Sequence, residues 1–223
     1  MRSNIDKHTI GFLTFDIAGT YNNTMWHHLF KAAQKKNIDL ITFCGGVLLD
    51  ESALHRQWNK IYDLASAKSI DGLIVLSASL SQSCGKSKLS EFLKRFSPLP
   101  IVSIGVELND AVSILLDNRE GMRQIVSHML NEHGISKPLF LAGPENNEEA
   151  NLRLEIYKEE MTRRGLIVYD DMIRHVSYRY DLAMEALEEA IASKADFDSV
   201  IAVNDDSALG AFDILKKHRI KVP

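Results

Sequence analysis

Residues 139–164 read LFLAGPENNEEANLRLEIYKEEMTRR: a short apolar run, a polar turn and a long segment of helical period. Leu139–Ala142 is apolar throughout, which is typical of a strand that helices cover on both faces. Asn147 precedes two glutamates, and a polar residue followed by acidic ones predicts a helix start, here over Asn147–Arg164. The stretch therefore predicts one strand–helix unit of a parallel sheet.

The same alternation of strand-like runs and helical segments continues over the rest of the chain. The predicted strands are Thr9–Phe15, Leu40–Cys44, Gly72–Ser77, Ile101–Ile104, Ser113–Leu116, Leu139–Ala142 and Ser199–Val203. The predicted helices are Asn22–Lys36, Glu51–Lys68, Ser87–Arg95, Arg119–Glu132, Asn147–Arg164, Leu182–Ser193 and Asp205–Lys217. Repeated alternation indicates βαβ units, and hence an α/β fold with parallel, doubly wound sheets.

The pattern changes near Asp117. Two strand-like runs, Ile101–Ile104 and Ser113–Leu116, follow each other without an intervening helix, and a new series of strand–helix units begins at Arg119. A crossing of the chain from one lobe to another explains this break. We therefore expect an N-terminal lobe over residues 8–117 and a C-terminal lobe over residues 118–223.

The composition is that of a folded, slightly acidic chain. It has 223 residues, 45% hydrophobic and 25% charged, so a sizeable core can form. A net charge of −4 argues against a nucleic-acid surface spread over the chain. No apolar run approaches the roughly 18 residues of a membrane span, and the first residues lack the apolar stretch of a secretory signal. The two cysteines, Cys44 and Cys84, suggest no disulfide or zinc framework, so we expect a reducing, cytoplasmic compartment without membrane contact.

Residue patterns that carry catalysis or hold cofactors are absent from the sequence. Residues 84–87, CGKS, resemble the end of a phosphate loop, but the glycine needed five residues before Gly85 is replaced by Leu80. There is no G-x-G-x-x-G after the first strand and no G-x-S-x-G nucleophile elbow. His128 and His133 lie five residues apart, so we expect them to face different sides of their helix. The sequence therefore predicts no enzymatic activity, no metal and no cofactor.

Polar groups gather where the first strand meets its helix. Residues 15–23 read FDIAGTYNN, which combines a glycine for turning with several hydrogen-bonding side chains. In open α/β sheets, ligands bind at the carboxyl ends of strands, close to helix N-termini. Asp16, Tyr21 and Asn22 are thus candidates for contacting a small polar ligand, with turn formation or helix capping as the alternative role of each.

Four motifs, taken together, resemble the effector-binding core of the lactose/galactose repressor family, which has the two-lobed type I periplasmic-binding-protein fold. They are IDGLI at 70–74, DNREG at 117–121, LAGP at 141–144 with NLRL at 151–154, and AVNDDSALG at 202–210. The resemblance covers residues 9–223. It implies a non-catalytic domain that binds a small effector in the cleft between its lobes.

Site residues follow from the resemblance position by position. Arg153 corresponds to an arginine that binds sugar hydroxyls or a carboxylate, with an exposed ion pair to Glu149 as its alternative role. Asn204 corresponds to a further ligand contact, with Asp205 expected to cap the following helix. Tyr178 falls where the family places an aromatic ring against the ligand. The residues expected to face the ligand from the first lobe are Asp16, Tyr21, Asn22 and Ser77, although its first loop lacks the usual Asn-Pro-Phe-Phe.

The chain departs from the repressors at both ends. Their helix-turn-helix has no counterpart before the first strand, so we expect no direct DNA contact from these residues. Relatives also continue beyond the match to Pro223 and complete both sheets, so we expect a fragment or a truncated product with an incomplete C-terminal lobe. The chain also resembles a subgroup of these sensors in which the sensing core is fused to a diguanylate cyclase or histidine kinase output. The residues that carry this resemblance are 41–46, ITFCGG, and 118–122.

The resulting hypothesis is a sensing domain of a bacterial transcriptional regulator or signalling protein. It binds a sugar or nucleoside and acts by closure of its lobes. A sugar-binding component of a transport system and an α/β enzyme are the alternatives. A homodimer is expected through first-lobe helices, with Glu51–Lys68 and Ser87–Arg95 as the candidate surface.

Overall fold

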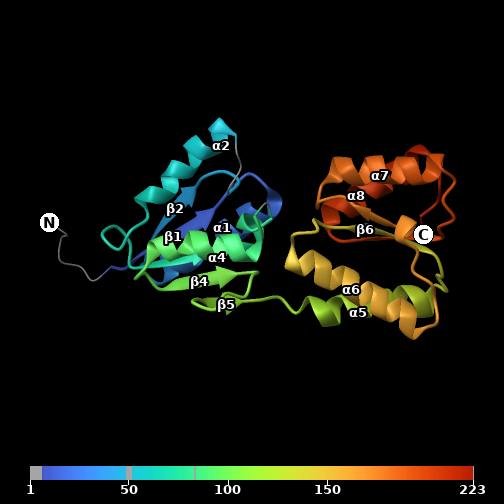
Figure 1. Cartoon of the computed structure of the whole chain (residues 1–223), viewed down its shortest axis with the longest axis horizontal. Helices are drawn as coiled ribbons and strands as arrows, with labels where there is room; N and C mark the ends of the chain where they lie inside the picture. Colours follow the sequence, from blue (N-terminus) through green and yellow to red (C-terminus); the bar gives the residue numbers. More distant parts are fainter. Residues whose placement is uncertain (1–6, 49–51, 83, 223) are drawn as a thin grey trace. The chain divides into compact units, whose positions relative to one another are not determined.

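Two parallel β-sheets organise the chain. The computed structural model describes residues 7–48, 52–82 and 84–222, and the chain divides into two compact units between Leu116 and Asp117 (Figure 1). The first unit has five strands in the order β2-β1-β3-β4-β5, and the second has three in the order β7-β6-β8. All neighbouring strands are parallel, which confirms the predicted fold class.

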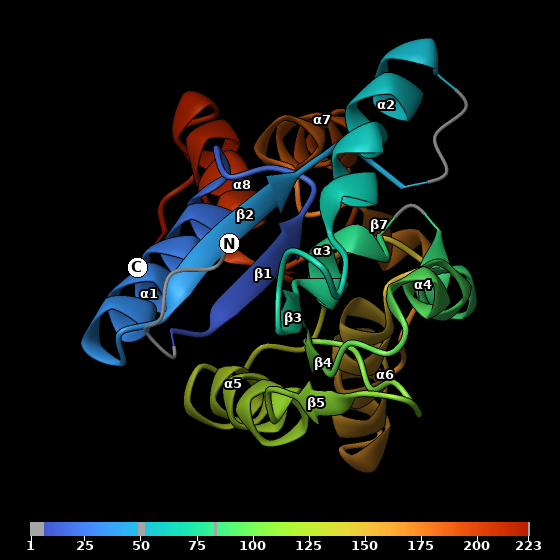
Figure 2. The same cartoon turned by 90° about the vertical axis from the view of Figure 1, so that its left-hand side faces the viewer.

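The first unit alternates strands with helices up to its last two strands. Its strands are β1 (Thr9–Thr14), β2 (Asp39–Cys44), β3 (Gly72–Val75), β4 (Ile101–Ile104) and β5 (Val112–Ile114). Its helices are α1 (Thr20–Lys35), α2 (Ala53–Trp58), α3 (Ser77–Leu80) and α4 (Gly85–Leu93), with 3-10 turns at Asn59–Leu64 and Lys94–Phe96. Figure 2 shows α1 on one side of this sheet and α4 on the other.

The core of the first unit lies beneath α4 and the 3-10 turn that continues α2. Leu89 of α4 and Tyr62 of that turn are fully buried against Leu13 and Val75 of the central strands. The Tyr62 hydroxyl donates to the carbonyl oxygen of Thr14 at 2.9 Å, so its polar end is satisfied inside the core. This packing fixes the carboxyl end of β1, where Asp16 and its loop begin.

The second unit is a three-layer sandwich. Its strands are β6 (Pro138–Ala142), β7 (Ile173–His175) and β8 (Ser199–Ala202). Its helices are α5 (Asn118–Glu132), α6 (Glu148–Arg163), α7 (Tyr180–Ala192) and α8 (Asp205–Lys217), with a 3-10 turn at Asp170–Met172. In Figure 1, α5 and α6 lie on one side of the sheet and α7 and α8 on the other.

Alternate residues of β6 fill the two halves of the second unit's core. Phe140 stacks on Tyr157 beneath α5 and α6, with ring centroids 4.6 Å apart. Leu139 and Leu141 pack against α7 and α8 on the opposite face. A strand buried on both faces explains the unbroken apolar run from which the fold was predicted. Within the described ranges, no helix is both long enough and apolar enough to cross a membrane.

The structure differs from the prediction at two predicted elements and at one strand that was not predicted. The third strand was predicted to reach Ser77, but β3 ends at Val75 and Ser77 begins the short helix α3. In place of the predicted helix Glu51–Lys68, the structure has the short helix α2 followed by the 3-10 turn at Asn59–Leu64. Glu51 lies outside the described residues. Strand β7 was not predicted, because Ile173-Arg174-His175 has a single apolar residue and sits at a sheet edge.

The contact of α7 with α8 depends on Gly210. A Cβ atom there would lie 2.3 Å from the carbonyl oxygen of Tyr180, a backbone atom that cannot turn away. We therefore expect Gly210→Ala to lower the free energy of unfolding by about 1–3 kcal/mol, measured by urea unfolding. Gly121→Ala in α5 is the matched control: nothing lies within 4 Å, so helix propensity should raise stability by about 0.5–1 kcal/mol. Equal effects of the two substitutions would contradict this packing.

Candidate functional site

Arg153 lies at the centre of a polar cluster at the carboxyl ends of the second unit's strands. From α6 its Nη1 donates to the carbonyl oxygen of Val203, just after β8, at 2.7 Å. Its Nε and Nη2 both donate to Oδ1 of Asn118, the first residue of α5, at 3.2 and 2.8 Å. These bonds fix the half-buried guanidinium in one orientation. We call Arg153, Asn118, Glu149, Tyr178 and Asn204 the polar cluster.

Glu149 supplies the cluster's carboxylate. It lies one helical turn before Arg153 on α6 and is half-buried. Burial raises the pKa of this carboxyl, while the charge of Arg153 and a hydrogen bond with Asn118 act in the opposite direction. The cluster therefore combines a hydrogen-bond donor held in place, Arg153, with a half-buried carboxylate acceptor, Glu149.

Tyr178 brings an aromatic ring to the same place. Ser177 and Tyr178 follow β7 with φ values of 51° and 62°, a left-handed conformation that non-glycine residues rarely adopt. The Tyr178 hydroxyl donates to Oδ1 of Asn147 at 3.1 Å, and a Cβ at Gly143 would lie only 3.0 Å from its ring. Burial raises the pKa of Tyr178 to about 12, despite the opposing charge of Arg153. The ring is held firmly, and strained backbone of this kind is common at ligand sites.

Asn204 is the N-cap of α8, and the prediction that Asp205 caps this helix is wrong. The extended backbone of Asn204, φ −154° and ψ 173°, aims its Oδ1 at the backbone N–H of Ser207, 3.1 Å away. Asp205 is already the first helical residue. The Nδ2 of Asn204 donates to the carbonyl oxygen of Tyr178 at 3.2 Å. Asn204 thus holds the Tyr178 loop to the start of α8.

The four candidates of the first unit occupy different settings. Asp16 accepts from the backbone N–H groups of Ala18 and Gly19, both at 3.0 Å, and so shapes its own turn. Tyr21 is 49% exposed on the first turn of α1. Both Asp16 and Tyr21 therefore present polar groups near the carboxyl end of β1.

Asn22 and Ser77 are buried within the first unit. The Oδ1 of Asn22 accepts from Ser79 of α3 at 2.8 Å, which brings α1 to the end of β3. Ser77 is fully buried, and Ser103 of β4 donates to its hydroxyl oxygen at 2.7 Å. These bonds hold the ends of neighbouring strands together, so both residues support the surface that Asp16 and Tyr21 occupy.

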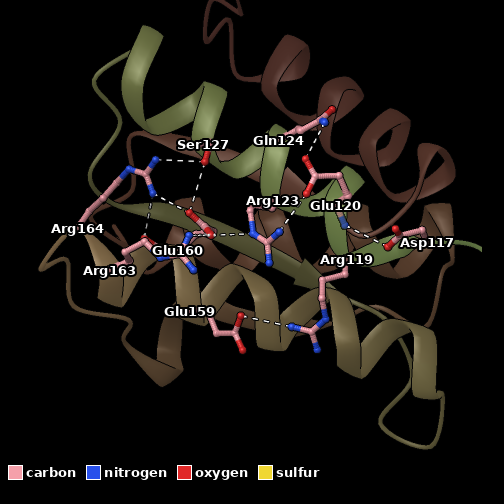
Figure 3. Close-up of polar contacts among 10 residues, drawn as sticks. All are labelled: Asp117, Arg119, Glu120, Arg123, Gln124, Ser127, Glu159, Glu160, Arg163 and Arg164. Atoms are coloured by element: carbon pink, nitrogen blue, oxygen red, sulfur yellow. Dashed lines mark hydrogen bonds and ion pairs between the residues drawn. The ribbon is translucent and has the colours of Figure 1, made fainter.

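A buried carboxylate fixes the two helices that carry Arg153 and Asn118. Glu160 of α6 is 1% exposed and lies 2.6 Å from Arg163, 2.8 Å from Arg164 and 3.4 Å from Arg123 of α5 (Figure 3). Burial alone would raise the pKa of Glu160, but the hydrogen bond from Arg164 and the charges of Arg163 and Arg164 lower it below its usual value. The ion pairs join α5 to α6 and so maintain the distance between Asn118 and Arg153.

Three residues at this site were not predicted as members of it. Asn118 and Asn147 were assigned only to a motif or a helix start, and Glu149 to a helix start and to the alternative ion pair of Arg153. The spacing of Glu149 and Arg153, which places them on one face of α6, is the local signal that linked these two residues.

Comparisons with known proteins agree with this architecture. Residues 7–223 match the family described as periplasmic binding proteins and sugar binding domain of LacI family. The ribose operon repressor of Escherichia coli is 22% identical over 217 residues, which are 97% of this chain and 62% of the repressor. The regulator RegA of Clostridium saccharobutylicum is 24% identical over 222 residues, 96% of this chain and 62% of RegA. The chain thus spans about three fifths of these relatives' length.

Solved structures show the same fold. A LacI-family transcriptional regulator from Burkhoderia phymatum superposes with a TM-score of 0.79 at 23% identity, over 97% of this chain and 76% of that one. A complex of the transcriptional regulator CelR with cellobiose gives a TM-score of 0.78 at 21% identity, over 96% of this chain and 64% of that one. The resemblance drawn from the four sequence motifs is therefore confirmed.

Proposed function

The chain belongs to the family of periplasmic binding proteins and LacI-type sugar-binding domains, and on this premise we propose that it senses a small hydroxyl-rich solute, a sugar or a nucleoside. Its relatives are transcriptional regulators, so we assign it to the effector-binding part of a regulator. No chemical step on the ligand is required of such a domain.

The observation that carries this proposal is the fixed orientation of Arg153. A guanidinium has five N–H donors. Three of them bond to Asn118 and Val203 in the second unit, so two N–H groups can donate to ligand oxygens. Glu149 beside it can accept hydroxyl protons, and the Tyr178 ring offers an apolar face to a sugar ring. A polyhydroxyl ligand needs this combination because each hydroxyl both donates and accepts.

Residues of the first unit are also proposed to contact the ligand. We assign Asp16 and Tyr21 to direct contact with the ligand, and Asn22 and Ser77 to positioning the strand ends beneath them. In the proposed mechanism, ligand binding favours one arrangement of the units over others. Coupling between ligand and output would then be about 1–3 kcal/mol, as is typical of allosteric proteins.

A thermal-shift panel tests the proposed ligand class. Pentoses, hexoses, disaccharides and nucleosides are each added to the chain at concentrations from micromolar to millimolar. At 100 times its dissociation constant, the true effector should raise the Tm by about 5–10 °C, because it binds only the folded state. No shift with any member of the panel would contradict a hydroxyl-rich effector.

We also propose that the chain forms a homodimer through helices of its first unit. Helix α2 and the turn after it expose Leu54, Trp58 and Leu64, each about half or more accessible to solvent. Light scattering should give twice the mass of one chain for the wild type and a single-chain mass for Trp58→Glu, which places a charge in the apolar surface. Tyr169→Glu, at an exposed position of the second unit, is the control and should stay dimeric. A monomeric wild type would refute the proposal.

A cytoplasmic location follows from the same proposal. The relatives regulate transcription, and both Cys44 and Cys84 are free thiols, as in reducing compartments. Partial burial raises the pKa of both thiols, although Cys44 is exposed and Cys84 is half-buried.

A further inference from the structure

His128 and His133 converge at the carboxyl end of α5, and the prediction that they face different sides of the helix is wrong. Their Nε2 atoms are 3.1 Å apart, and their rings meet at 81°. Helix α5 ends at Glu132, and His133 is its C-cap residue, with φ −108° and ψ −4°. Gly134 then turns the chain with φ 63°. The His133 ring therefore meets the His128 ring at the point where the helix ends.

We propose that this histidine pair chelates a divalent transition-metal ion, with Cu²⁺ and Ni²⁺ preferred over Zn²⁺. Metal–imidazole bonds are about 2.0–2.1 Å long, so two nitrogens on one metal lie about 2.9–3.4 Å apart for angles between square-planar and tetrahedral. The observed Nε2 separation falls within that range. Each ring then carries its hydrogen on Nδ1, and its Nε2 lone pair binds the metal.

The surroundings of the pair suit a cation that exchanges with solvent. Both histidines are exposed. They lie at the helix end that carries partial negative charge, and the last turn of α5 contains Glu132 but no Lys or Arg. Arg164 donates to the neighbouring Asn131, but its charge is paired with Glu160. In the described part of the chain no third acidic, Cys or His side chain joins the pair, so water fills the other positions of the metal.

The preference among ions follows from this ligand set. Two imidazoles with open positions suit Cu²⁺ and Ni²⁺, and affinity for nitrogen ligands rises toward Cu²⁺ along the first transition series. A structural zinc site would need four protein ligands. The pair is therefore a surface chelate that is filled or empty according to metal concentration.

Calorimetric titration of the chain, without any affinity tag, with Ni²⁺ and with Cu²⁺ tests the proposal. We expect one ion per chain at the pair. His128→Gln and His133→Gln should each weaken binding roughly 100-fold, because the second ligand no longer binds intramolecularly. Metal at ten times its dissociation constant should also raise the Tm of the wild type by about 3–5 °C, and neither variant should show this rise.

The double substitution His27→Gln with His28→Gln is the matched control. These histidines are also exposed and adjacent on a helix, but their ring centroids are 6.4 Å apart. The control should bind Ni²⁺ and Cu²⁺ as the wild type does. Unchanged binding in His133→Gln, loss of binding in the control, or no binding by the wild type at 1 mM metal, about the weakest useful affinity, would each overturn the proposal.

Discussion

Arg153→Ala should weaken effector binding at least about tenfold while leaving the chain folded. The guanidinium makes charge-assisted hydrogen bonds, each worth about 1.5–3 kcal/mol, and its loss leaves ligand oxygens unpaired. It would also leave the carbonyl oxygen of Val203, a buried residue, without the donor now 2.7 Å away. We therefore expect a loss of about 1–3 kcal/mol in stability as well. Calorimetric titration with the effector found in the panel, alongside urea unfolding, measures both effects.

Two further variants separate a specific contact from a general loss of charge. Arg153→Lys retains the charge but not the planar fork, so its affinity should fall between those of the wild type and Arg153→Ala. Arg174→Ala removes an arginine of β7 whose Nη1 lies 3.5 Å from the carbonyl oxygen of Ile173, and it should bind as the wild type does. If Arg153→Ala binds the effector with unchanged affinity, Arg153 is not a ligand contact.

Glu160→Ala should have the largest effect on stability, a loss of about 3 kcal/mol in the free energy of unfolding. Removing one partner of a buried ion pair leaves the other charges uncompensated, and here Arg163, Arg164 and Arg123 all lose their shared carboxylate. The neighbouring Glu159→Ala is the control, since the Glu159 side chain is 40% exposed and its pair with Arg119 is 3.5 Å long. We expect that change to cost less than about 0.5 kcal/mol. Urea unfolding of the two variants checks the difference.

The pH dependence of stability gives a second test of Glu160. Its pKa is lower in the folded chain than the ordinary value of about 4.3 in the unfolded chain. Its contribution is therefore present above that ordinary pKa and is lost as the pH falls through the lowered folded-state pKa. Glu160→Gln cannot titrate, so its stability should fall less than that of the wild type over this acidic range. Parallel pH profiles would rule out this role of Glu160.

The fold was predictable because its elements carry local signals. Helix α8 has the predicted bounds Asp205–Lys217, and β4 has the predicted bounds Ile101–Ile104. The departures occur where local pattern and tertiary context disagree. Strand β7 forms because its backbone pairs with β6, although its own residues are mostly polar. The convergence of His128 and His133 occurs at a helix end, where sequence spacing no longer sets direction.

The site residues were predictable only through motifs, and their hydrogen-bond partners were not predictable. Arg153 and Asn204 follow from the resemblance, but the partners of Arg153 lie 35 and 50 residues away in sequence. Asn22 meets Ser79 across 57 residues. No periodicity or local motif links such pairs, because the sheet order brings them together. The capping role of Asn204 depends on a backbone conformation that Asn and Asp adopt almost equally well, so the sequence did not distinguish Asn204 from Asp205.

A crystal structure of the chain with the effector from the panel tests whether the polar cluster binds the ligand. We expect ligand oxygens within hydrogen-bonding distance of the Arg153 guanidinium and a ligand ring against Tyr178, with the bonds from Arg153 to Asn118 and Val203 still present. A ligand bound elsewhere, with no contact to the polar cluster, would contradict it.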